Sequence, residues 1–211
     1  MDKKKRERFT RIYEQCFALY PDAAALPSNK LYYLHRQWIF PNHIDPVLTY
    51  IEAFHKRFYP GSNLEVALCA GLLHDAGLVY GRSSNSPSGH EERSCRFATI
   101  LLQQEDYDVD FIRRVCQAIK ATEPSVLPAT EEAVLVRNAD AYSHLSSMHF
   151  IGKAYFAEDI KSYIEWFDAK LHGSLKKLTI PDLVKEKAPT VEMYEVLLAT
   201  YHRHQGKRYI D

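Results

Sequence analysis

The chain contains 211 residues, and its 27 basic side chains equal its 27 acidic ones, so the formal charge is zero when histidine is neutral. Hydrophobic residues make up 46% of the chain and charged residues 26%, with only 8 glycines and 10 prolines. These proportions are typical of a soluble globular protein and exclude a collagenous or largely disordered one. The neutral balance also argues against a dedicated nucleic-acid surface.

The four cysteines, Cys16, Cys69, Cys95 and Cys116, form no CxxC pair and lie in apolar helical patterns. This favours buried free thiols over a zinc knuckle or a disulfide framework. The basic N-terminal segment leads into an amphipathic pattern, and the longest apolar run, residues 66–73, is too short to span a bilayer. We therefore expect a cytoplasmic protein with no membrane partner.

Helical periodicity dominates the first half of the chain. It predicts a helix that ends before Pro21, a second at residues 29–38, a third that follows Pro41 and stops at Pro60, and a fourth at residues 64–78. The fourth is apolar on nearly all sides and should therefore be central.

The second half is also helical, after a turn-rich loop at residues 81–89 that can form one wall or lid of a pocket. Helices are expected from His90, around residues 112–119, from residue 131, around residues 160–167 and around residues 193–201. A glycine and two prolines predict an irregular connection at residues 173–189. No alternating strand pattern stands beside these helices, so we predict one all-α domain over residues 1–211.

A histidine and an aspartate stand together, as His74 and Asp75, at the C-terminal end of the most apolar stretch. A charged pair is costly to bury unless it is paired or coordinates a metal. The two side chains can give one nitrogen and one oxygen to a single cation. Because such dipeptides are common by chance, the pair needs support from other positions.

Two further residues are expected near this pair. His43 lies near the start of the preceding helix, and an antiparallel hairpin brings that start close to His74 and Asp75. Asp140 lies between two alanines in an apolar helix, and its carboxylate needs a partner. A cation satisfies both residues, although His43 taken singly can be a core histidine and Asp140 can pair with Arg137.

The order of these residues on successive helices resembles the HD superfamily of metal-dependent phosphohydrolases. The resemblance covers roughly residues 38–148 and rests on the segments PNHIDPVLTYIEAF, ALCAGLLHDAGL and VLVRNADAYSHL. It implies an HD-domain-like helical bundle, to which this chain adds N- and C-terminal helices. It also implies one divalent metal ion held by His43, His74, Asp75 and Asp140.

The ligand set implied by the resemblance suggests a metal and a reaction. Mixed nitrogen and oxygen ligands suit Mn²⁺, Fe²⁺, Co²⁺ or Ni²⁺ better than Mg²⁺ or Zn²⁺. Such an ion polarises a phosphoryl oxygen and acidifies a bound water, which can then cleave a phosphoester or phosphoanhydride. Asp75 can double as a general base, although a ligating carboxylate is a poorer base than a free one.

The chain departs from family members that bind a second metal, which usually carry two more histidines. SGHEERS places His90 at one of these positions, but AIKATEPS has Thr122 at the other. We therefore expect a single metal ion, with His90 as a catalytic pocket residue that contacts the substrate or a metal-bound water.

Three residues are candidates for binding the substrate. Arg137, Asp140 and His144 share a helix face, so Arg137 and His144 should border the pocket if Asp140 points into it. Lys120, close to Thr122, can neutralise a phosphate. The alternatives are a salt bridge for Arg137 and a solvated side chain for Lys120.

These features predict a hydrolase of a small phosphorylated molecule, and the habits of the family suggest a nucleotide. An HD-type di-iron oxygenase is the alternative enzyme, but it needs more histidine ligands. A metal-stabilised binding or regulatory module with little turnover is the alternative from another class. The aromatic stripes of the terminal helices can pack on the core or form a homodimer interface.

Overall fold

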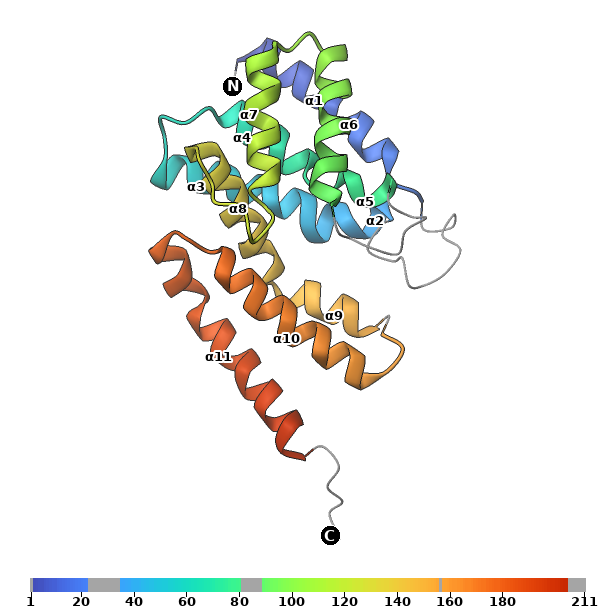
Figure 1. Cartoon of the computed structure of the whole chain (residues 1–211), viewed down its shortest axis with the longest axis vertical. Helices are drawn as coiled ribbons and strands as arrows, with labels where there is room; N and C mark the ends of the chain where they lie inside the picture. Colours follow the sequence, from blue (N-terminus) through green and yellow to red (C-terminus); the bar gives the residue numbers. More distant parts are fainter. Residues whose placement is uncertain (1, 23–34, 81–88, 156, 205–211) are drawn as a thin grey trace.

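The computed structural model describes residues 2–22, 35–80, 89–155 and 157–204, and these residues form helices and no strand (Figure 1). The predicted all-α class is therefore confirmed. The predicted helix at residues 29–38 and the turn-rich loop at residues 81–89 lie mostly outside the described residues.

The helices follow one another through short connections. The first half contains α1 (Lys3–Leu19), α2 (Arg36–Ile39), the π-helical turn η3 (Phe40–Ile44), α3 (Asp45–Phe58), α4 (Leu64–Leu73) and α5 (Ala76–Tyr80). The second half contains α6 (His90–Gln104), α7 (Val109–Lys120), α8 (Glu131–His144), α9 (Ser147–Tyr155), α10 (Ile160–Lys177) and α11 (Pro181–His204).

Helix α4 is the centre of the bundle. Every residue from Glu65 to Leu73 is buried, and the helix packs against α1, α3, α6, α7 and α8. The Asn63 side chain caps its start by accepting hydrogen bonds from the backbone N–H groups of Glu65 and Val66. A helix surrounded on all sides needs an apolar sequence on all sides, as predicted.

The helix that carries His43 starts earlier than predicted. The chain is continuously helical from Arg36 to Phe58, through Pro41, instead of starting after it. Proline has no N–H to donate within a helix, and the wider π-helical turn η3 accommodates it. His43 therefore lies inside a helix and is buried.

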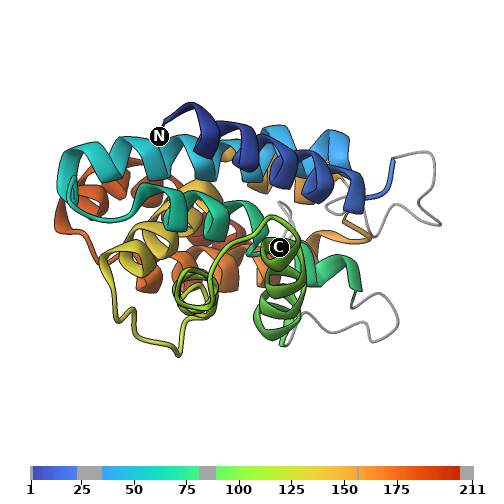
Figure 2. The ribbon, with the colours of Figure 1, turned by 90° about the horizontal axis from the view of Figure 1, so that it is seen from above.

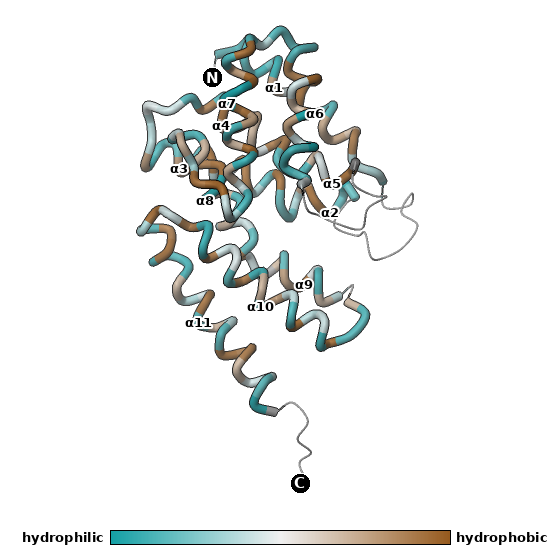
Figure 3. Tube along the Cα trace, viewed as in Figure 1, coloured by the Kyte–Doolittle hydropathy of each residue, from teal (hydrophilic) through white to brown (hydrophobic). Residues whose placement is uncertain are grey.

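The hydrophobic residues gather where helices face one another (Figure 3). Helices α6 and α7 pack side by side in Figure 1 and are seen nearly end-on in Figure 2, where α1 and α3 lie across the view. The α6–α7 pair thus crosses α1 and α3 steeply. None of the described helices is long and apolar enough to cross a lipid bilayer.

The C-terminal helices form a second layer below the bundle in Figure 1, where α10 packs on α8, α9 and α11. The prediction of an irregular connection at residues 173–189 is wrong, because α10 continues through Gly173 to Lys177 and α11 starts at Pro181. Proline at the first position of a helix loses no hydrogen bond, and α11 also contains Pro189. Only residues 178–180 connect the two helices.

Candidate metal centre

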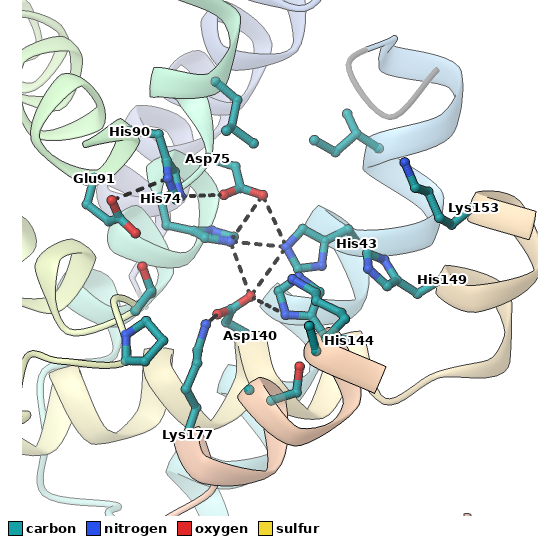
Figure 4. A pocket seen from close by; sticks show the side chains of 18 of the residues that line it. His43, His74, Asp75, His90, Glu91, Asp140, His144, His149, Lys153 and Lys177 are labelled. Atoms are coloured by element: carbon teal, nitrogen blue, oxygen red, sulfur yellow. Dashed lines mark hydrogen bonds and ion pairs between the residues drawn. The ribbon is translucent and has the colours of Figure 1, made fainter. Parts of the chain in front are cut away.

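Two histidines and two aspartates from three helical segments meet in the interior (Figure 4). The Nε2 atoms of His43 and His74 are 3.1 Å apart. Asp75 Oδ2 lies 3.3 Å and 3.5 Å from these two nitrogens, and Asp140 Oδ1 lies 3.5 Å and 3.6 Å from them. The carboxylates approach the histidine pair from opposite sides (Figure 4). The proximity expected between His43, the His74–Asp75 pair and Asp140 is thus confirmed.

Local hydrogen bonds orient both imidazoles. His74 lies where α4 ends, and its Nδ1–H donates to the carbonyl of Gly71 over 2.8 Å. His43 Nδ1 lies 3.1 Å from the hydroxyl of Ser143 on α8. With Nδ1 engaged in each ring, the two Nε2 atoms face the carboxylates, which is the arrangement that second-shell hydrogen bonds give to metal-binding histidines.

The electrostatics of the cluster favour a positive charge at its centre. Burial alone would lower the pKa of His74, but the charges of Asp75 and Asp140 raise this pKa to about 9. Burial would raise the pKa of Asp75 and of Asp140, yet neighbouring histidines, and Lys177 beside Asp140, hold both pKa values well below the ordinary one. The carboxylates therefore stay ionised and hold a proton on His74 that a cation can replace.

The residues present fit a divalent metal ion. Asp140 Oδ1 is buried and receives no well-aligned hydrogen bond from any described residue, so a cation would satisfy it. Ligands about 2.1 Å from an octahedral ion lie about 3.0 Å apart when adjacent, close to the spacing of the two Nε2 atoms. The ligand atoms of His43, His74 and Asp75 lie within 4.8 Å of one another, and so do those of His43, Asp140 and His144, so the two groups together offer three nitrogens and two oxygens.

The cluster lines a cavity of about 470 Å³. His90, the first residue of α6, also lines it, and its Nε2 lies 3.4 Å from Asp75 Oδ1 while its Nδ1 lies 3.3 Å from a carboxylate oxygen of Glu91. His90 therefore bridges two carboxylates beside the proposed ligands. Thr122 lines the cavity as well, but its hydroxyl donates to the carbonyl of Ile119.

His144 borders the cavity as predicted, with its Nδ1 3.2 Å from Asp140 Oδ1. Its ring stacks on that of His43, with centroids 4.5 Å apart, and contacts His149 at 4.8 Å. Burial lowers the pKa of His144 and of His149, so both rings are neutral at pH 7. They shield the side of His43 that faces away from His74.

Two residues predicted to bind the substrate, Arg137 and Lys120, do not line the cavity. Arg137 does not border the cavity, because its buried guanidinium turns to the end of α7 and donates to backbone carbonyls. Its acceptors are the carbonyl oxygens of Ala121, Glu123, Pro124, Val126 and Lys177. Carbonyls at a helix end lack partners within the helix, and the five-donor guanidinium satisfies them. Lys120 lies outside the cavity and pairs with Glu92 at 2.8 Å.

The cations that do line the cavity come from α9 and α10. Lys177 is buried and forms a hydrogen-bonded ion pair with the second carboxylate oxygen of Asp140. Lys170 lies seven residues earlier on α10, and burial together with the charge of Lys177 lowers its pKa to about 8. Lys153 on α9 is the third lysine. The three lysines lie outside the segments that carry the family resemblance and were therefore not predicted from the sequence. The seven-residue spacing of Lys170 and Lys177 is the sequence signal that could have placed these two on one helix face.

The fold and the site thus define an all-helical protein with a candidate site for a divalent metal ion, formed by two histidines and two aspartates in one cavity. A family model described as HD domain matches residues 40–145, half of the chain, and the chain belongs to this family. HD domains bind divalent metals, and the family is generally hydrolytic. No curated protein and no solved structure matches the chain significantly.

Proposed function

We propose that this protein is a metal-dependent phosphohydrolase that cleaves a phosphoester or phosphoanhydride bond of a small molecule such as a nucleotide. The observation that carries the proposal is one cavity in which the His–Asp cluster and three lysines meet. A divalent ion at the cluster supplies Lewis-acid polarisation of a phosphoryl oxygen and a more acidic water. HD-domain membership supports hydrolysis, and the lysines support an anionic substrate.

In this proposal the protein residues have separate tasks. His43, His74, Asp75 and Asp140 hold the ion. Lys177 holds the second oxygen of Asp140 in place and brings a positive charge next to the substrate phosphate. His90, between Asp75 and Glu91, carries a proton to the leaving oxygen.

Hydrolysis adds one water molecule across the bond. The water oxygen forms a new bond to phosphorus, the bond from phosphorus to the leaving oxygen breaks, and one proton of the water ends on the leaving group. His90 can take a proton from the attacking water and pass it to the leaving oxygen, so it starts and ends the cycle neutral. The variant His90→Asn should therefore lower kcat while the protein keeps its metal.

The test is metal analysis of the purified protein together with phosphate or pyrophosphate release from a nucleotide panel with added Mn²⁺ or Co²⁺. Asp75→Ala should abolish release and lower metal content. Asp110→Asn, which alters an exposed carboxylate on α7, is the matched control and should change neither.

Three outcomes would contradict the proposal. Release that persists in Asp75→Ala would refute the site. Two irons per chain with oxygen consumption would favour the di-iron oxygenase. Bound metal without release from any substrate would favour a binding or regulatory module.

A further inference from the structure

Part of the cavity is built by chain that the HD-domain match does not cover. We call this part the accessory wall and define it as Trp38, His149, Lys153, Trp166 and Lys170. Trp38 precedes residues 40–145, and the other four residues follow them on α9 and α10. The family core therefore supplies the proposed metal ligands, whereas this chain adds a wall of its own.

The accessory wall presents fixed aromatic surfaces. The chain has two tryptophans, and both line the cavity. The Trp166 ring contacts those of His149, Phe150 and Tyr163, at centroid distances of 5.6 Å, 5.9 Å and 6.3 Å. Trp38 lies so close to α9 that a Cβ at Gly152 would be 1.9 Å from its ring. Aromatic surfaces held in this way bind a flat ring with little loss of side-chain entropy.

Neither lysine of this wall pairs with an acidic side chain of the described residues. Lys170 makes no hydrogen bond or ion pair with a described residue, and Lys153 has its ammonium 5.5 Å from the centroid of the Trp166 ring. Lys177, by contrast, is already paired with Asp140. The ammonium groups of Lys153 and Lys170 are thus available to an anion.

The formal charges of the cavity indicate how many charges that anion carries. Among the described lining residues, the three carboxylates Asp75, Glu91 and Asp140 balance Lys153, Lys170 and Lys177 when histidines are neutral. A divalent metal ion would leave two positive charges. A phosphate monoester dianion restores neutrality, whereas a diester carries one negative charge and a nucleoside diphosphate about three.

We propose that the accessory wall makes this protein selective for phosphate monoesters of a flat aromatic or heteroaromatic group. The ring packs on Trp166 and Trp38, and Lys170 with Lys153 balances the phosphate dianion. This inference rests on the proposed function, because it assumes that a phosphate lies beside the metal centre. It narrows the substrate from any phosphoester or phosphoanhydride to one class.

Binding can be measured without turnover, because both tryptophans report on the cavity through their fluorescence. Three probes with uncleavable carbon–phosphorus bonds separate ring from charge: phenylphosphonate, methylphosphonate, which lacks the ring, and the monomethyl ester of phenylphosphonate, which lacks one charge. With Mn²⁺ at pH 7.5, below the pKa of about 8 of Lys170, phenylphosphonate should bind about tenfold or more tightly than either of the others. Equal affinity for all three would overturn the proposal.

Two variants assign the selectivity to the wall. Trp166→Leu should weaken phenylphosphonate binding about tenfold and leave methylphosphonate unchanged, with Trp38 as the remaining reporter. Lys170→Met should lower the preference for the dianion over its monomethyl ester severalfold. Lys176→Met, an exposed lysine on the same helix, is the matched control and should keep that preference. A Lys170→Met protein that keeps it would overturn the role of Lys170.

Hydrolysis of p-nitrophenyl phosphate and bis(p-nitrophenyl) phosphate separates this proposal from the proposed function. Faster turnover of the monoester, with a KM raised in Lys170→Met, supports both. Equal turnover of monoester and diester, with a KM that Lys170→Met leaves unchanged, overturns the accessory-wall proposal alone. Selective phosphonate binding without hydrolysis of any ester overturns the proposed function and leaves the recognition of a ring and a dianion standing.

Discussion

Gly77 is the position where one methyl group should most directly disturb the candidate site. It lies in α5, two residues after Asp75, and its backbone meets the start of α6. Its N–H donates to the Ser94 hydroxyl over 2.8 Å, and its carbonyl accepts from Arg93 over 2.9 Å. These contacts fix His90, at the start of α6, relative to Asp75.

The clash in Gly77→Ala can be worked out from the structure. The added Cβ would lie 2.0 Å from the carbonyl oxygen of His90, whereas ordinary contacts start at 3.4 Å. The two backbones must therefore separate by about 1.4 Å, the difference between these distances. Overpacking of this kind costs roughly 2 kcal/mol, which lowers Tm by about 4–8 °C in a protein of this size.

The functional effect should exceed the loss of stability. His90 Nε2 lies 3.4 Å from Asp75 Oδ1, and a displacement of about 1 Å can lower a rate by up to about 100-fold. We expect kcat/KM for the best substrate to fall about 10- to 100-fold at 20 °C, with metal content unchanged. Thermal unfolding, metal analysis and steady-state kinetics measure these effects.

The matched control is Gly61→Ala, because a Cβ at Gly61 would meet nothing within 4 Å. It should keep the Tm and the kcat/KM of the wild type. If Gly77→Ala also kept both, the close approach of α5 and α6 would not position His90, and the reasoning would be refuted.

Three further predictions concern other residues. Arg137→Met should lower the free energy of unfolding by about 3 kcal/mol or more, because several buried carbonyls lose their donor. Chemical denaturation measures this loss, and a raised KM at unchanged stability would instead restore the substrate-binding role. Because the pKa of His74 is raised to about 9 although burial alone would lower it, a metal ion must displace its proton below pH 9. The apparent affinity for Mn²⁺ in calorimetry should therefore rise about tenfold per pH unit from pH 7 to 9 and level off above, and a flat profile would contradict this. Burial would raise the pKa of Glu132, but hydrogen bonds from the Asn63 N–H and from Arg114 hold it below its ordinary value of 4.5. The stability that ionised Glu132 contributes is thus present above pH 4.5 and is lost as the pH falls through the lowered pKa. In Glu132→Gln the free energy of unfolding should therefore depend less on pH in the acid range than in the wild type. Equal pH dependence in the two proteins would show that the carboxylate contributes nothing.

The clustering of the proposed metal ligands could be predicted from the sequence, because three of the four interrupt apolar helices. His74 and Asp75 interrupt the most apolar stretch of the chain, and Asp140 interrupts another apolar helix. Buried polar groups need partners, so their positions in apolar helices already constrain them to meet. The short connection between α3 and α4 then brings His43 to the same point.

The direction of the long Arg137 side chain could not be predicted from the sequence. Helical spacing placed Arg137 on the face of Asp140, but three residues along a helix differ in direction by about 60°. That difference is enough for the guanidinium to reach the carbonyls that follow α7 instead of the cavity. Which acceptors the guanidinium bonds to depends on the packing between helices that are distant in the sequence.

The sequence by itself determined the helical class and the proximity of the four proposed ligands, because both depend on short-range periodicity and on the cost of burying charge. Only the tertiary structure decided that α10 contributes Lys170 and Trp166 to the cavity, since this depends on which face of α10 packs on α8. It also decided that residues 173–189 are largely helical, because packing against neighbouring helices outweighs the weak propensities of glycine and proline there. The proposed reaction chemistry thus rests on local motifs and the family they resemble, and the proposed selectivity rests on long-range packing.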